Sequence, residues 1–140
     1  MSRPISIRFP DDIAHRVSGR VASTNEATSG LVVRLVDEGI RMAEHPGIVF
    51  RDGPTGRRAG LAAGPDVWEI ICVLRDYAIG GAPQAVRNTA AALAVTEPQV
   101  RTAEGYYAAF PAEIDDRIGL NADAADLAAS SARVRADLRR

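Results

Sequence analysis

The sequence contains no lysine, and its only cysteine is Cys72. A lone cysteine excludes a disulfide within the chain and is typical of a reducing compartment. Aromatic residues make up only 5% of the chain, which favours small cores between packed helices over one large core. No apolar run approaches the roughly 18 residues that a membrane-spanning helix needs, and the first residues do not resemble a secretory leader. These absences predict a cytoplasmic protein without a membrane partner.

The charges of the chain are nearly balanced. All 17 basic residues are arginines, and 18 acidic residues bring the formal net charge to -1. The total charge therefore gives no sign of nucleic-acid binding, which depends on local patches. The chain also lacks a nucleophile–base pair, a phosphate-binding loop, a metal-ligand cluster and a cofactor fingerprint. We therefore expect no enzymatic activity, no cofactor and no metal.

Residues 4–10 alternate strictly between apolar and polar side chains. The apolar set is Ile5, Ile7 and Phe9, and the polar set is Ser6 and Arg8. This period of two predicts a half-buried strand that Pro10 ends. A single short strand leaves both of its edges unpaired, so we expect it to pair with the same strand of a second copy. The polar face of the resulting ribbon would then be available to read DNA.

Two helices are expected after this strand. Asp11 and Asp12 suit a first helical turn, and the apolar spacing predicts a helix over residues 11–23. Thr28 or Ser29 is expected to cap a second helix, which ends near Glu44. Apolar residues cover more than one face of this helix, a pattern that suits burial between two subunits. The residues expected in the dimer core are Ile5, Ile7, Phe9, Val32, Leu35 and Val36.

The segment Ile-Ser-Ile-Arg-Phe-Pro, an acidic helix start and Ser29-Gly30-Leu31 together resemble the ribbon-helix-helix repressors, the class of Arc and MetJ. The resemblance implies an intertwined homodimer whose paired strands enter the major groove of operator DNA. Position by position, it would place Ser6 and Arg8 against bases and the start of the second helix against a phosphate. Pro4 departs from the pattern, because a proline cannot hydrogen-bond a base edge. The DNA-binding residues expected in this way are Arg3, Ser6, Arg8, Thr28 and Ser29.

Residues 45–118 follow a different pattern. Two short strands, Ile48–Arg51 and residues 57–62, flank a turn rich in glycine and proline, which predicts a hairpin. Three helices follow, and a tight turn before Pro98 makes them typical of a helix-turn-helix-like unit. Eight acidic side chains against four basic ones over residues 65–120 oppose phosphate binding, so we favour a protein-interaction role over a second DNA contact. Hairpin residues Arg51, Arg57 and Arg58 are either contacts with nucleic acid or a protein partner, or solvated charges.

This region also carries the motifs of a second family. The matching residues are His45-Pro46-Gly47-Ile48-Val49-Phe50, Gly56-Arg57-Arg58, Val67-Trp68-Glu69-Ile70, Tyr106-Tyr107 and Pro111-Ala112-Glu113-Ile114-Asp115. They resemble a small bacterial domain that is commonly encoded beside PIN-like ribonuclease toxins and is assigned to VapB-type antitoxins. Residues 86–94 depart from that family, because they lack its usual Tyr-Pro ending. The resemblance implies a PIN-like ribonuclease toxin as a partner.

Residues 119–140 form a third segment. Apolar and small residues recur there at steps of three and four, which predicts a helix with a thin apolar face and a basic end. Such a face is too thin to stabilise an isolated helix, so we expect it to be loose until bound or to dock on the neighbouring domain. A basic helix suits an acidic nuclease site, and Arg133 or Arg135 is expected to enter that site. The residues expected to bind toxin are Leu127, Arg133, Val134, Arg135 and Leu138.

The sequence therefore predicts a mainly α chain of three parts. These are a ribbon-helix-helix domain over residues 1–44, a hairpin plus helix-turn-helix-like domain over residues 45–118, and a C-terminal helical tail over residues 119–140. We expect an antitoxin that binds operator DNA as a homodimer or higher oligomer and neutralises a PIN-like ribonuclease toxin. The alternative is a stand-alone ribbon-helix-helix regulator with no toxin. A third possibility is a structural adaptor that does not touch DNA.

Overall fold

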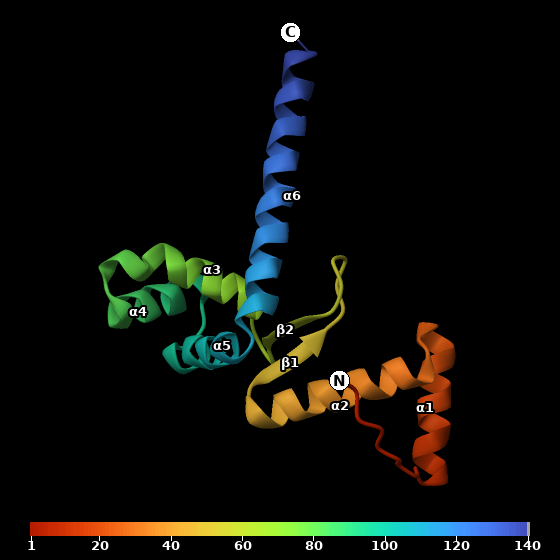
Figure 1. Cartoon of the computed structure of the whole chain (residues 1–140). Coiled ribbons are helices and arrows are strands. Elements are labelled where there is room, and N and C mark those ends of the chain that lie inside the picture. Colours follow the sequence, from red (N-terminus) through yellow and green to blue (C-terminus); the bar gives the residue numbers. More distant parts are fainter. Residues whose placement is uncertain (140) are drawn as a thin grey trace. The chain divides into compact units, whose positions relative to one another are not determined.

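The computed structural model describes residues 1–139, which form six α-helices, one short 3-10 helix and one two-stranded antiparallel sheet (Figure 1). The fold is therefore mainly α, as the sequence predicts. The chain divides into two compact units, Met1–Arg41 and Met42–Arg140. Arg140, which we expected at the basic end of the tail, lies outside the described residues. No helix in the described part is long and apolar enough to cross a membrane.

The N-terminal unit contains α1 (Asp11–Thr24) and most of α2 (Thr28–Glu44). The predicted helix boundaries are confirmed to within a residue or two. Asn25 closes α1 in the left-handed conformation, with φ of 55°, which asparagine tolerates better than most residues. The prediction that Thr28 or Ser29 caps α2 is wrong by one residue. The Ala27 carbonyl accepts the first helical hydrogen bond, from Leu31 N at 3.0 Å, so Thr28 and Ser29 already lie in the first turn.

Residues 1–10 have no regular secondary structure. The strand expected over residues 4–10 is therefore absent from the single chain, which begins its regular structure with helices. A strand is held by hydrogen bonds to a neighbouring strand. The only strands among the described residues, β1 (Ile48–Arg51) and β2 (Arg58–Leu61), pair with each other. The single chain thus offers residues 4–10 no partner strand.

The C-terminal unit begins with the predicted hairpin. Ile48 lies opposite Leu61 and Arg51 opposite Arg58 in the antiparallel register. Gly56 has a φ of 100° in the connecting turn, a conformation that L side chains rarely adopt. The hairpin forms where the sequence predicts it, because its turn chemistry is local.

Four α-helices follow the hairpin. They are α3 (Val67–Tyr77), α4 (Ala82–Leu93), α5 (Glu97–Ala109) and α6 (Pro111–Asp137), with the 3-10 helix η1 (Ala78–Gly80) between α3 and α4. Prolines occupy the first turns of α4, α5 and α6, where no hydrogen-bonded N–H is lost. Thr96 caps α5, with its N–H donating to Gln99 Oε1 at 2.8 Å and its hydroxyl accepting from Gln99 N at 3.3 Å.

The core of this unit forms where the hairpin and the first turns of α6 meet α3, α4 and α5. Tyr106 is fully buried, and its hydroxyl donates to Glu113 Oε1 at 2.9 Å. His45 and Phe110 pack against its ring, with centroids 5.4 and 4.8 Å away. Trp68 and Tyr107 are half-buried against the same core. The buried members are Ile48, Ala59, Leu61, Val67, Ile70, Ile71, Val86, Ala90, Val100, Ala103, Tyr106 and Ile114.

Helix α6 begins at Pro111, eight residues before the segment that we expected to be a separate tail. Ile114 is buried and Ile118 packs against the core, so the first two turns belong to the folded unit. Every described residue from Gly119 onward is exposed. The expected tail is therefore the second part of one continuous helix, which extends away from α3, α4 and α5 (Figure 1).

Candidate DNA-binding and protein-binding surfaces

The N-terminal unit leaves most of its apolar side chains exposed. Ile5 and Ile7 are 81% and 61% exposed. On α2, apolar residues are exposed on more than one face: Val33, Leu35, Val36 and Ile40. Val32 is half-buried. A soluble monomer rarely carries so much uncovered apolar surface on so few residues.

A hollow of about 450 Å³ lies between α1 and α2 in this unit. Its apolar walls come from Ile13, Val17 and Leu35, and Arg16 and Arg20 complete its lining. No residue of α1 is buried, and on α2 Leu31 and Glu38 are buried, so the two helices enclose little apolar surface by themselves. The hollow is thus a largely apolar surface that the N-terminal unit itself leaves uncovered.

Three acidic residues of α2 and of the turn before it, Glu26, Asp37 and Glu38, are engaged by arginines of α2. Arg34 binds Glu26 through two hydrogen bonds, at 3.1 and 2.7 Å, and lies 3.6 Å from Glu38. The hydrogen bond from Arg34 holds the pKa of Glu26 below its usual value. Arg41 pairs with Asp37 at 3.0 Å. These pairs engage Glu26, Asp37 and Glu38, whereas Asp11 and Asp12 in the first turn of α1 have no arginine partner within 4 Å among the described residues.

The expected DNA-binding residues are all exposed. Arg3, Ser6 and Arg8 lie in the irregular N-terminal segment, and Thr28 and Ser29 lie in the first turn of α2. Within residues 1–139, Arg3 and Arg8 have no acidic group within 4 Å. The first N–H groups of a helix have no intrahelical partner, so the start of α2 can donate hydrogen bonds to an anion.

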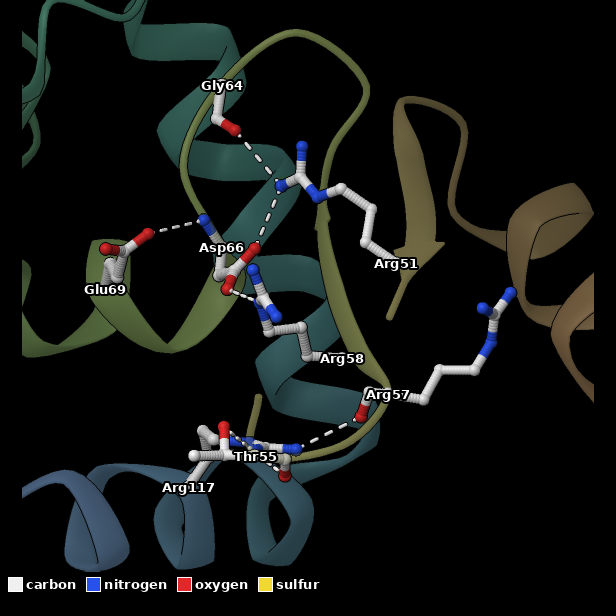
Figure 2. Close-up of polar contacts among 8 residues, drawn as sticks. All are labelled: Arg51, Thr55, Arg57, Arg58, Gly64, Asp66, Glu69 and Arg117. Carbon is white, nitrogen blue, oxygen red and sulfur yellow. Dashed lines mark hydrogen bonds and ion pairs between the residues drawn. The ribbon is translucent and has the colours of Figure 1, made fainter. Parts of the chain in front are cut away.

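Two of the three hairpin arginines, Arg51 and Arg58, bind the carboxylate of Asp66 (Figure 2). Arg51 Nη2 donates to Asp66 Oδ1 at 2.9 Å, and Arg58 Nε donates to Asp66 Oδ2. Arg51 also donates to the Gly64 carbonyl at 3.1 Å. The Asp66 N–H in turn donates to Glu69 Oε2 at 2.8 Å at the start of α3. Arg51 and Arg58 therefore hold the hairpin to the start of α3 and are not simply solvated charges, while a contact with nucleic acid or toxin stays a prediction.

Arg117 fastens the hairpin turn to α6 (Figure 2). Its Nη1 donates to the Thr55 carbonyl at 2.7 Å and to the Thr55 hydroxyl at 2.8 Å. Its Nη2 donates to the Arg57 carbonyl at 3.1 Å. Arg57 itself pairs with Asp52 at 3.1 Å. These hydrogen bonds thus hold the turn to the first part of α6.

A second polar cluster joins α3, α5 and α6 on the surface. Arg75 Nη2 donates to Asp115 Oδ1 and, at 2.5 Å, to the Tyr107 hydroxyl. The hydrogen bond from Arg75 lowers the pKa of Asp115, and the hydrogen bond to Asp115 raises the pKa of Arg75. This cluster links α3, α5 and α6 through side-chain hydrogen bonds.

The expected toxin-binding residues lie on the exposed part of α6. Leu127, Val134 and Leu138 are 70%, 57% and 81% exposed. Within the described residues, Arg133 has no partner, and Arg135 Nε donates only to the backbone carbonyl of Ser131, at 3.2 Å. The five expected residues thus share one segment that the rest of the C-terminal unit does not cover.

One surface feature has no signal in the sequence. Glu104 on α5 is half-buried and lies between two hollows beside α4. A lone glutamate in an ordinary helical pattern gives no indication of this position. Among residues 1–139, no cluster of three or more His, Cys, Asp or Glu side chains could hold a metal ion.

Comparison with known proteins does not assign these surfaces to a family. No family model, curated protein or solved structure matches the chain. The two family resemblances therefore rest on the residues quoted for them.

Proposed function

We propose that the chain is an antitoxin that binds its own operator as a ribbon-helix-helix dimer and neutralises a PIN-like ribonuclease toxin. The N-terminal unit would dimerise and bind DNA. The exposed part of α6 would bind the toxin.

The observation that carries the proposal is the uncovered apolar surface of the N-terminal unit. Ile5, Ile7 and Phe9 all remain exposed, although they share one side of an alternating segment. A second copy would give residues 4–10 the partner strand that the single chain lacks, and would bury these side chains with the exposed apolar face of α2. One antiparallel ribbon between two copies would thus supply the partner strand and also bury the exposed apolar side chains.

The charges of the N-terminal unit support DNA as the ligand of that ribbon. Strand alternation puts Ser6 and Arg8 on the face opposite Ile5, Ile7 and Phe9. Glu26 and Asp37 are neutralised by Arg34 and Arg41, so they do not offset Arg3 and Arg8. The balanced charge of the whole chain therefore does not oppose a basic DNA-binding face.

The exposed part of α6 supports a protein partner. Its apolar residues lie at steps of three and four on a helix that its own unit does not cover. A helix with an exposed apolar stripe, even a thin one, can bind by laying that stripe in a groove. Arg133 and Arg135 would bring guanidinium groups to the carboxylates of a metal-dependent nuclease site.

Operator binding is tested with the full chain and DNA from its own promoter in a mobility-shift titration. Arg8→Ala is expected to remove the preference for promoter over unrelated DNA, because a good base contact contributes about 1–3 kcal/mol of discrimination. Arg87→Ala is the matched control, since it removes the same charge from an exposed position on α4. Sequence-specific binding that survives Arg8→Ala would show that this residue does not read the operator.

Toxin binding is tested by co-purification with the product of the adjacent gene, followed by a ribonuclease assay. An Arg133→Ala, Arg135→Ala double variant is expected to lose neutralisation, while an Arg87→Ala, Arg101→Ala variant keeps it. If the Arg133→Ala, Arg135→Ala variant still neutralised the toxin fully, the proposed role of these arginines would be wrong. A chain that binds its operator but no nuclease would instead be a stand-alone regulator, and one that binds neither would be an adaptor.

A further inference from the structure

A groove in the C-terminal unit runs along Glu104. Two hollows, of about 220 and 230 Å³, share Ala82 and Glu104 in their linings. The first has apolar walls from Leu74, Ala78 and Ala85, and the second from Pro83 and Val86. We refer to these two hollows together as the Glu104 groove. The groove therefore has apolar walls, the carboxylate of Glu104 in both hollows, and one arginine in each, Arg75 and Arg101.

Glu104 has no hydrogen bond or ion pair with any residue in the described part of the chain, although it is half-buried. The two arginines that also line the groove are engaged elsewhere. Arg75 binds Asp115, and Arg101 lies 3.6 Å from Glu97. A partly desolvated carboxylate gains from a cationic partner. The groove therefore fits an apolar helix face flanked by arginine.

The basic end of α6 has this chemistry. Val134 and Leu138 are one turn apart, so they project from the same side of the helix, and both are exposed. Arg133, Arg135 and Arg139 surround them, and Asp137 is the only acidic residue after position 126. The apolar pair matches the floor of the groove, and the arginines match Glu104.

A chain cannot place this end of α6 in its own groove. Helix α6 is continuous from Pro111 to Asp137, and its exposed part extends away from α4 and α5 (Figure 1). At 1.5 Å per residue, position 138 lies about 40 Å along the helix from Pro111. The end of the helix is far enough from its own unit to meet another molecule.

We propose that the C-terminal end of α6 docks in the Glu104 groove of a second copy of the chain. Val134 and Leu138 would contact the apolar walls, and an arginine of the same end would pair with Glu104. This contact does not depend on the proposed antitoxin function. It uses the same face of α6 as the proposed toxin site, so toxin and second copy would compete for that face.

The test joins two differently tagged full chains by a disulfide, both in a Cys72→Ser background. Ala82→Cys marks the groove of one chain and Leu138→Cys marks the helix end of the other, and the two chains are co-expressed without toxin and mildly oxidised. The mixed disulfide is expected at about ten times the yield obtained when Ala122→Cys replaces Leu138→Cys. Ala122 is exposed on α6 but lies outside the basic end.

Charge reversal then tests the role of the carboxylate. Glu104→Arg in the groove chain is expected to lower the mixed-disulfide yield at least fivefold, and Arg135→Glu with Arg139→Glu in the other chain is expected to restore it. Asp116→Arg is the matched control, since Asp116 is exposed and does not line the groove. Equal yields at positions 138 and 122, or no loss with Glu104→Arg in a chain of unchanged melting temperature, would overturn the proposal.

Discussion

Arg51, at the end of β1, donates a hydrogen bond to Asp66, the residue before α3, at 2.9 Å. Arg58, opposite Arg51 in the hairpin, donates to the other oxygen of the same carboxylate. The Asp66 side chain is only 8% exposed. One nearly buried carboxylate thus connects both strands of the hairpin to the start of a helix.

Asp66→Ala is expected to lower the free energy of unfolding by about 2–3 kcal/mol, because it leaves two partly buried guanidinium groups without an acidic partner. Urea denaturation of the full chain measures this loss. Asp52→Ala is the control, since Asp52 pairs with Arg57 on the surface and such pairs contribute less than about 1 kcal/mol. Equal losses for the two variants would contradict the role of Asp66.

Gly60 leaves room for this network. A Cβ atom at position 60 would lie 2.9 Å from Arg51 Cζ and 2.9 Å from Asp66 Oδ1, closer than real Cβ contacts allow. Gly60→Ala is therefore expected to displace Arg51 and to cost about 1–3 kcal/mol of stability. Gly105→Ala in α5 should have the opposite effect, a gain of about 0.5–1 kcal/mol, because nothing lies within 4 Å of its added Cβ. Melting temperatures of the two variants that move in the same direction would contradict the argument.

Thr89 contributes a buried hydroxyl with no hydrogen-bond partner among the described residues. Thr89→Val replaces this hydroxyl with a methyl group of similar shape. The variant is expected to be more stable by about 1 kcal/mol, because the desolvation cost of the unpaired hydroxyl disappears. Thr102→Val is the control, since the Thr102 hydroxyl donates to the Pro98 carbonyl at 3.0 Å and should show no such gain. Chemical denaturation measures the free energy of unfolding of both variants, and an equal change in the two would contradict the prediction.

Asp115 is expected to make stability depend on pH. Its pKa is lowered from 3.8 in the folded chain by the hydrogen bond from Arg75, with a further contribution from Tyr107. A carboxyl group whose pKa is lower in the folded state stabilises the fold above its unfolded pKa, and this contribution is lost as the pH falls through the folded value. Asp115→Asn should therefore be less stable than the natural chain at pH 7, and the difference should shrink at pH 2.5.

Denaturation at the two pH values measures this difference. Asp116→Asn is the control, because Asp116 is the adjacent carboxylate and has no arginine partner within 4 Å in residues 1–139. A destabilisation by Asp115→Asn that does not change between pH 7 and pH 2.5 would show that the ion pair with Arg75 contributes nothing.

The sequence predicts those parts of the fold whose causes are local. Turn residues and apolar spacing correctly indicate the hairpin and helices α1 to α5. The sequence prediction misses the start of α6, although Pro111 is typical of a first helical turn. The inward turn of Arg51 and Arg58 depends on Asp66, which is remote in sequence and gives no signal of its position. The half-burial of Glu104 likewise depends on how α4 packs beside α5. Residues 4–10 show the opposite case, since their alternation is clear but the single chain forms no strand there.

Ile7 and Ser6 test the proposed ribbon, because they are adjacent and would lie on opposite faces of it. Ile7→Asp is expected to raise the dimer dissociation constant at least about 100-fold, since it would bury an unpaired carboxylate between two subunits. Ser6→Asp adds the same charge on the DNA side, so it should keep the dimer and abolish operator binding through repulsion from phosphate. Sedimentation velocity measures the first effect and a mobility-shift titration the second. A dimer that tolerates Ile7→Asp as well as Ser6→Asp would show that residues 4–10 do not form the subunit interface.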